Sequence, residues 1–231
     1  MGQKARRPLR ALSTVLITSG LLMLSDAGLT VIWQEPASAI YAHFVQGSLG
    51  DDLRRLKLAK PSEIDLAALR SLQDRRARLA FLARGLRRRS DRGTAVARIR
   101  APDAGINDVV VNGTDAASLR KGPGFYDDHP FPGAPGTVAV AGHRTTYGAP
   151  FRRIDKLRKG DTITIEMPYE RFTYRVERSR IVAPSEVSVV RRVSYDRLVL
   201  SACHPLYSAA QRIVVFARLH SAQARGQALE R

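Results

Sequence analysis

The chain has 231 residues, with 38 Lys and Arg against 21 Asp and Glu, a formal net charge of +17 and 44% apolar residues. This apolar content excludes a disordered tail, and the length suits one ordinary domain with an appendage rather than two enzyme domains. A single cysteine, Cys203, excludes an intramolecular disulfide and a multi-cysteine zinc or iron–sulfur site. Cys203 is therefore either a small buried apolar residue or a reactive thiol.

Much of the positive charge lies outside the predicted folded domain. Residues 1–10 carry four basic residues and no acid, and residues 51–92 carry 13 basic and 6 acidic residues, a net charge of +7. Such an excess suits nucleic acid, anionic lipid or an acidic wall polymer. The sequence has no aromatic ladder, zinc-finger spacing or recognition helix, so we expect no nucleic-acid partner.

An apolar segment near the N-terminus predicts a membrane anchor. Residues 11–32 would span about 30 Å as a helix, enough to cross a bilayer, and Asp26 is the only charged residue among them. The basic tail at 1–10 precedes this segment and no Lys or Arg follows before Arg54, so the positive-inside rule puts the N-terminus in the cytoplasm and the rest outside. Ala37-Ser38-Ala39 resembles a signal-peptide cleavage site, but the apolar stretch is long for a secretory signal. We therefore expect an uncleaved anchor at 11–33.

Residues 34–93 are expected to form a helical stalk or linker. Leu, Ala and Arg recur at steps of three and four between Leu53 and Leu86, interrupted by Pro61 and Gly85. This pattern predicts two short helices that end in the run Arg87-Arg88-Arg89. Two interpretations stay open: a solvated spacer that carries the domain clear of the membrane, or a basic face held against anionic lipid or wall phosphate.

Residues 94–220 have the pattern of an all-β domain, followed by a tail at 221–231. Gly, Pro, Asn and Asp separate short β-rich runs, with one brief helix-like stretch at 116–121. Seven or eight such strands predict a closed antiparallel barrel. The expected strands are 95–99, 108–111, 136–141, 161–166, 172–182, 197–202 and 212–219.

Cys203 and Arg212 are expected to face each other across a hairpin. Cys203 closes one predicted strand and Arg212 opens the next, with eight residues between them. An arginine beside a cysteine favours the thiolate and can donate hydrogen bonds to an oxyanion that develops on a substrate.

Among the five histidines, His143 best suits a general acid or base. It ends the predicted strand at 136–141 and begins a loop, a usual placement for a catalytic side chain. His204 follows Cys203 directly and would point to the opposite face of a continuing strand. His43 lies close to the membrane segment and His220 at the end of the domain, while His129 lies in a polar turn where a metal site is a weaker alternative.

Two sequence blocks resemble the sortases, most closely class E, the actinobacterial housekeeping group. Residues 136–151, GTVAVAGHRTTYGAPF, are similar to the histidine block of that family, and residues 198–205, LVLSACHP, followed by Gln211 and Arg212, are similar to its cysteine and arginine block. The resemblance covers roughly residues 95–220 and the anchor. It implies an eight-stranded sortase barrel with His143, Cys203 and Arg212 as the catalytic triad.

The resemblance also implies a reaction and its partners. Sortases are cysteine transpeptidases that cut a sorting signal of secreted proteins between Thr and Gly, form a thioacyl intermediate and pass the protein to a cell-wall amine. Class E enzymes are associated with Leu-Ala-x-Thr-Gly rather than Leu-Pro-x-Thr-Gly signals, and Tyr147 matches the tyrosine linked to that choice. The resemblance further suggests substrate contacts at Thr145 and at Ala202, where sortases usually carry Thr.

The ordinary pKa values of a thiol and an imidazole predict slow turnover. Only about one molecule in a hundred would hold thiolate and imidazolium together at neutral pH. Four acids, Asp161, Glu166, Glu170 and Glu177, match no calcium-loop spacing, so we expect neither an obligatory metal nor a cofactor.

Two other functions are weighed against this one. A Cys-His hydrolase or L,D-transpeptidase would need sequence blocks that are absent here. A membrane-anchored, extracytoplasmic β-barrel binding module with Cys203 as a non-catalytic core residue is the alternative that needs no enzyme.

Overall fold

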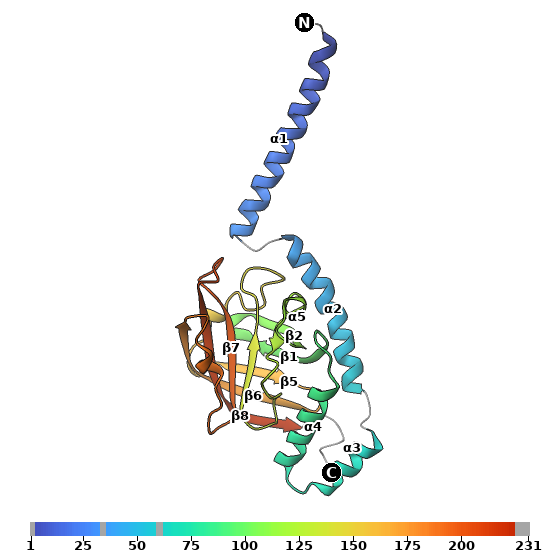
Figure 1. The fold of residues 1–231 in the computed structure, drawn as a ribbon, viewed down its shortest axis with the longest axis vertical. Helices are drawn as coiled ribbons and strands as arrows, with labels where there is room; N and C mark the ends of the chain where they lie inside the picture. The colour runs from blue at the N-terminus through green and yellow to red at the C-terminus, as the bar shows by residue number, and fades with distance from the viewer. Residues whose placement is uncertain (1–2, 33–35, 59–61, 225–231) are drawn as a thin grey trace.

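The computed structural model describes residues 3–32, 36–58 and 62–224. Figure 1 shows a long N-terminal helix that projects from one end of a β-barrel, with further helices lying along the side of the barrel. The helices are α1 (Gln3–Ile32), α2 (Pro36–Leu58), α3 (Glu63–Ser71), α4 (Arg75–Arg89) and α5 (Ala116–Leu119), with 3-10 turns η1 (Pro102–Ala104), η2 (Ile154–Lys156) and η3 (Val187–Val190). The strands are β1 (Ala95–Ala101), β2 (Ile106–Asn112), β3 (Gly124–Phe125), β4 (Thr137–Ala141), β5 (Thr162–Glu166), β6 (Glu170–Val182), β7 (Arg197–His204) and β8 (Gln211–Ala224).

Helix α1 has the length and composition of a membrane span. Its apolar window Arg10–Gly28 is not buried against the rest of the protein, and side chains such as Leu22 and Leu24 are exposed. An exposed apolar helix of this length is consistent with the predicted anchor. Trp33, at the predicted outer edge of the anchor, lies outside the described residues.

The eight strands close into a barrel in the order β1-β2-β3-β4-β7-β8-β6-β5. The sequence predicts the closed barrel, but the expectation of purely antiparallel pairing is wrong, because β2 pairs with β3 and β4 pairs with β7 in parallel. Parallel neighbours need a long crossover, and the segment between β4 and β7 contains β5 and β6. The two-residue strand β3 is too short to leave a periodic pattern in the sequence.

Alternation along the strands divides their side chains between two apolar clusters. On β7, Leu198, Leu200 and Ala202 belong to the barrel interior, whereas Val199 belongs to a cluster on the outer face. That outer cluster consists of Ala139, Val182, Val199, Val214 and Phe216, partly covered by Tyr126, Val189 and Val190. The sheet made by β4, β7 and β8 is therefore apolar on both faces.

The segment predicted to be a stalk packs on the barrel instead of acting as a solvated spacer. Leu49 and Leu53 of α2 are buried against Ala95, Val109 and Val111 of β1 and β2. Helix α4 buries Leu79, Ala80, Ala83, Gly85 and Leu86. Apolar residues at helical spacing in this segment are therefore contacts with the barrel.

The helix ends only partly follow the prediction. Helix α4 ends at Arg89, as expected, but Gly85 lies inside it and does not interrupt it, while Pro61 lies outside the described residues. Side-chain caps define two starts: Ser62 accepts from the Asp65 amide before α3, and Asp74 accepts from the Ala77 amide before α4.

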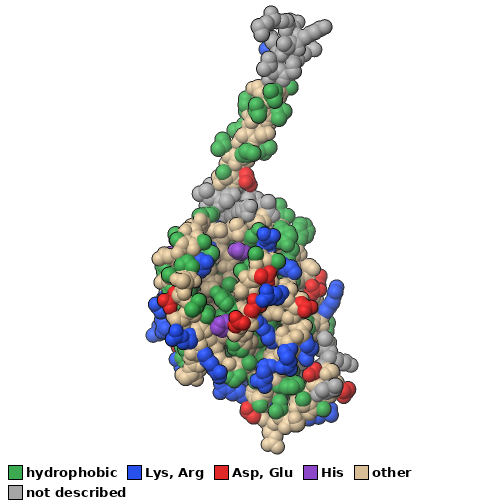
Figure 2. Space-filling model, in the orientation of Figure 1, with side chains coloured by type: hydrophobic (Ala, Val, Ile, Leu, Met, Phe, Trp, Pro, Cys, Tyr) green, Lys and Arg blue, Asp and Glu red, His purple; other side chains and the backbone are tan. Residues whose placement is uncertain are grey.

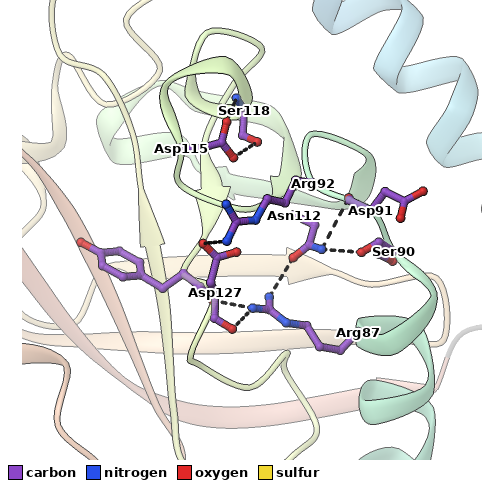
Figure 3. A network of polar contacts seen from close by, with 9 residues as sticks. Arg87, Ser90, Asp91, Arg92, Asn112, Asp115, Ser118 and Asp127 are labelled. Carbon is purple, nitrogen blue, oxygen red and sulfur yellow. Dashed lines mark hydrogen bonds and ion pairs between the residues drawn. The ribbon is translucent and has the colours of Figure 1, made fainter.

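Arg87 fastens the end of α4 to the barrel rather than facing lipid (Figure 3). It donates to the Asn112 side chain at 2.8 Å, to the Tyr126 carbonyl at 2.9 Å and to the Asp127 carbonyl. Burial lowers the pKa of Arg87 despite the nearby Asp127. The first arginine of the run 87–89 is thus a structural contact.

Candidate active site

The C-terminal ends of β4 and β7 bring His143 and Cys203 to neighbouring positions. The parallel register pairs Ala141 with Ser201, and the Gly142 amide donates to the Ser201 carbonyl at 3.1 Å. His143 lies two residues beyond Ala141, and Cys203 lies two residues beyond its partner Ser201. The register, continued by two residues beyond its last pair, puts His143 level with Cys203.

Arg212 joins them from β8. It pairs directly with Cys203 in the antiparallel β7–β8 ladder, where paired side chains share a face with Cβ atoms about 5 Å apart. One guanidinium nitrogen, Nη1, donates to the carbonyls of Ala209 and Gln211, each at 2.9 Å. Within the described part of the chain, no carboxylate lies within ion-pair distance of Arg212.

The side chains of Cys203 and Arg212 belong to the outer face of the sheet. Because strand residues alternate, Cys203 shares a face with Val199, and Arg212 shares one with Val214, both members of the outer apolar cluster. Cys203 is partly exposed rather than sealed in the interior. The outer apolar cluster therefore lies on the same face of the sheet as Cys203 and Arg212.

His143 occupies a half-buried position. Burial lowers its pKa, and the positive charge of Arg120 lowers it further. Its ring lies 5.3 Å from the ring of Tyr147, centroid to centroid. Burial and the charge of Arg120 both disfavour imidazolium. Fewer molecules than the ordinary pKa values predict should therefore hold Cys203 as thiolate and His143 as imidazolium together.

Tyr147 connects the loop after His143 to helix α2. Its amide donates to the Ser38 hydroxyl at 3.0 Å, and its ring meets the ring of Tyr41 edge to face at 6.5 Å. The guanidinium of Arg120 lies 5.8 Å from its ring centroid. Ser38 and Tyr41 lie more than a hundred positions before Tyr147, and no local sequence signal links them.

Arg144 contacts the candidate site, although the sequence did not single it out. It is only 3% exposed, and it pairs with Asp155 at 3.1 Å. It also lies 3.4 Å from the Cys203 carbonyl and 3.2 Å from His204 Nδ1. Arg144 therefore joins the histidine loop to the end of β7, and its position next to His143 was the only available signal.

The other residues considered for the site are Ala202 and His204 on β7 and Thr145 in the loop after His143. Ala202 is 4% exposed and belongs to the barrel interior, so its side chain points away from the face that carries Cys203. A residue at this position therefore contributes to interior packing, and the expected substrate contact at Ala202 stays a prediction. Thr145 lies in the loop between His143 and Tyr147 and is half-buried. His204 continues β7, as the argument for opposite faces required.

The acids considered for calcium form ion pairs or backbone contacts. Glu170 pairs with Arg75 at 2.8 Å, Glu177 pairs with Arg218 at 2.8 Å, and Asp161 accepts from the Arg158 amide. His129 contacts the Thr137 carbonyl within a turn. Among the described residues there is no group of three or more His, Cys, Asp or Glu that could hold a metal ion.

A closed barrel whose parallel β4–β7 pair leads into a histidine and a cysteine is a sortase-type barrel. A family model for the sortase domain matches residues 99–220, more than half of the chain. The chain therefore belongs to the sortase family.

Known relatives include sortases of classes D and E. Sortase D of Bacillus subtilis (strain 168) is 33% identical over 113 residues, covering 47% of this chain and 56% of that protein. Sortase SrtE1 of Streptomyces coelicolor is 32% identical over 93 residues, covering 36% of this chain and 26% of that protein. The chain thus spans about half and about a quarter of these two relatives. The solved structure of sortase E from Streptomyces avermitilis matches with a TM-score of 0.53 and 32% identity, over 61% of this chain and 99% of that one.

Proposed function

We propose that this protein is a membrane-anchored cysteine transpeptidase in which Cys203 is the nucleophile, His143 the general acid and base, and Arg212 the oxyanion donor. The observation that carries the proposal is the direct pairing of Cys203 with Arg212 on the face where the register also directs His143. The alternative, a binding module with a core cysteine, is disfavoured because Cys203 is partly exposed.

The first half of the reaction is acyl transfer to the enzyme. The Cys203 thiolate attacks the Thr carbonyl carbon of a Leu-Ala-x-Thr-Gly or Leu-Pro-x-Thr-Gly signal and forms a tetrahedral oxyanion. The guanidinium of Arg212 donates hydrogen bonds to this oxyanion. When the intermediate collapses, the C–N bond to Gly breaks, and the leaving amine takes a proton from His143 imidazolium. The product is a thioester between Thr and Cys203.

The second half passes the acyl group to an amine of a peptidoglycan precursor. Neutral His143 accepts a proton from this amine as its nitrogen attacks the thioester carbonyl. The C–S bond then breaks, the Cys203 thiolate leaves, and the substrate protein is joined to the wall through an amide. If water attacks instead, the product is a free carboxylate.

The proposed site of action is the outer surface of the cytoplasmic membrane. The basic residues before α1 support a cytoplasmic N-terminus with the barrel outside. The hydrogen bond between Ser38 and Tyr147 supports an uncleaved anchor, since cleavage after Ala39 would remove Ser38 from the protein.

A thiol-reactive sorting-signal analogue tests the proposal. The full chain in detergent should gain the mass of one analogue on Cys203, while Cys203→Ala should gain none. With an ordinary signal peptide and an amine acceptor, the wild type should form the ligated product. Labelling of Cys203 without ligation or hydrolysis would leave a reactive thiol but no transpeptidase. The absence of an adduct would favour the binding module.

A further inference from the structure

The outer surface of α2 changes in character along the helix. Near α1 it is apolar: Ile40 is 62% exposed and Phe44 is 73% exposed, one helical turn apart. About two to three turns beyond Phe44, α2 exposes the charged residues Asp51, Asp52, Arg54 and Arg55, and Leu58 is exposed at its far end. The opposite face of the same helix carries the residues buried against the barrel, so Ile40 and Phe44 do not contribute to that packing.

A second exposed apolar site lies at the same end of the barrel, in the loop between β7 and β8. Leu206 is 37% exposed and Tyr207 is 50% exposed in this loop. The parallel β4–β7 pair ends here, and the loop after β4 contacts the beginning of α2 through Tyr147 and Ser38. Figure 1 shows the start of β8 at the barrel end nearest α1, and Figure 2 shows apolar side chains over the start of α2 at that end.

The chain keeps this end of the barrel close to α1. Ser38 is six residues beyond Ile32, the last residue of α1, and six residues reach at most about 20 Å. The loop that carries His143 is bonded to Ser38. If α1 crosses the membrane, the candidate active site therefore lies within a few tens of ångströms of the bilayer, whichever way α1 is tilted.

We propose that the α1-facing end of the barrel is a membrane-docking surface, in which Ile40 and Phe44 of α2 and Leu206 of the β7–β8 loop enter the boundary between lipid headgroups and acyl chains. The proposal rests on the proposed membrane anchor. Apolar and aromatic side chains favour this boundary, and the charged residues Asp51 to Arg55 that follow Ile40 and Phe44 along α2 suit the water beyond it. Docking holds the barrel end that carries Cys203 at the membrane surface.

Tryptophan fluorescence in vesicles tests the docking surface, because Trp33 is the one tryptophan of the chain. In a Trp33→Phe background, single tryptophans are introduced by Phe44→Trp and Leu206→Trp. Val187→Trp is the matched control: Val187 is 76% exposed on η3, and η3 leads to Arg191, which accepts from Thr137 at the opposite end of β4. Leu22→Trp, within α1, reports on the anchor itself. Each full chain is reconstituted in phosphatidylcholine and phosphatidylglycerol vesicles with or without brominated acyl chains.

The proposal predicts that brominated lipid quenches the tryptophans at 22, 44 and 206 but not the one at 187, with blue-shifted emission at 44 and 206. Emission at 44 and 206 that matches the control at 187, with the tryptophan at 22 quenched, would overturn docking and leave the anchor intact. An unquenched tryptophan at 22 would overturn both. Transpeptidation of a soluble signal peptide by the same vesicles shows separately whether the proposed chemistry stands.

Discussion

The barrel interior and the barrel end that carries the candidate active site are stabilised by different means. The interior is filled by large apolar side chains such as Ile99, Ile163 and Phe172, which regular strand pairing holds in place. The loop that begins at His143 has three successive residues with positive φ: Tyr147 at 51°, Gly148 at 75° and Ala149 at 44°. Such a conformation costs about 1 to 3 kcal/mol for each non-glycine residue and persists only when its surroundings impose it.

In this protein, distant elements impose the loop conformation. Ser38 accepts from the Tyr147 amide, and a Cβ at Gly148 would lie 2.9 Å from the Ala42 side chain, so α2 lies directly against the loop. Arg144 ties its beginning to the end of β7. The loop after His143 depends on contacts that the barrel interior does not make, so activity and stability should respond separately to substitution.

The largest difference between loss of activity and loss of stability is expected at Arg212. Replacing Arg212 with Ala should lower kcat/KM by about 100- to 1,000-fold, the usual effect of losing an oxyanion donor. Arg212→Lys should restore little, since an ammonium does not reproduce the guanidinium fork. The melting temperature should barely change because Arg212 is half-exposed and its guanidinium donates to backbone carbonyls of its own loop.

Arg180→Ala provides the control for charge, because Arg180 is an exposed arginine on β6, the strand beside β8. Its turnover should stay near that of the wild type. Near-normal turnover of Arg212→Ala would remove Arg212 from the oxyanion role.

The second prediction asks whether α2 supports catalysis. Leu53 is 1% exposed and packs α2 on β1 and β2, so Leu53→Ala should lower the free energy of unfolding by about 2 to 4 kcal/mol. Ile163→Ala, in the interior on β5, should have a similar effect on stability. At a temperature where both variants are folded, only Leu53→Ala should lose activity. Equal activity losses would mean that α2 stabilises the barrel without supporting the loop. Urea unfolding and kinetics on the same preparations measure both quantities.

Local patterns account for most of what the sequence predicts. Alternation and turn residues locate seven of the strands, and the hairpin spacing brings Cys203 opposite Arg212, as the register confirms. These features depend on residues close together in the chain. The eighth strand, β3, has only two residues and is held by pairing with β2 and β4, so no periodicity could reveal it.

Long-range contacts explain what the sequence does not predict. The partners of Arg144 and the contact of Tyr147 with Ser38 join segments between 8 and 109 positions apart. The sequence also does not predict the burial of α2 against β1 and β2, because the apolar face of a helix indicates burial but not which surface it packs against. The extension of β8 to Ala224, past the expected strand end at 219, follows from its pairing with Glu170 on β6.

The third prediction places extra volume at the start of the catalytic loop. A Cβ at Gly142 would lie 2.6 Å from Phe151 Cδ2, and the Phe151 side chain is fully buried and cannot move aside freely. Gly142→Ala should therefore destabilise the protein by about 1 to 3 kcal/mol. Displacement of the adjacent His143 should lower kcat by about ten- to a hundredfold.

Gly47→Ala is the matched control for the third prediction, because Gly47 lies in α2 with no atom within 4 Å of an added Cβ. It should stabilise the helix slightly and leave kcat unchanged. Unchanged kcat in Gly142→Ala would show that the loop tolerates a shift of His143.

The smallest effect is expected at Arg120, whose charge lowers the pKa of His143. Arg120→Gln removes that charge, so the pKa of His143 should rise. If the active form holds Cys203 as thiolate and His143 as imidazolium, the acid limb of kcat/KM against pH moves to higher pH, and the maximum increases because more molecules hold both ions together. Arg153→Gln, an exposed arginine that does not contribute to the shift of His143, should leave the profile in place.

NMR titration separates the electrostatic effect on His143 from altered substrate binding. The His143 imidazole is followed in Cys203→Ala, with and without Arg120→Gln, so that no thiolate contributes to the titration. A raised pKa together with an unmoved acid limb would mean that His143 does not titrate in the kinetic profile, and the acid role would have to pass to another group. An unmoved pKa would mean that solvent already screens the exposed guanidinium of Arg120. Burial alone would then hold the pKa of His143 down, which would tie the chemistry of this loop more closely to its packing.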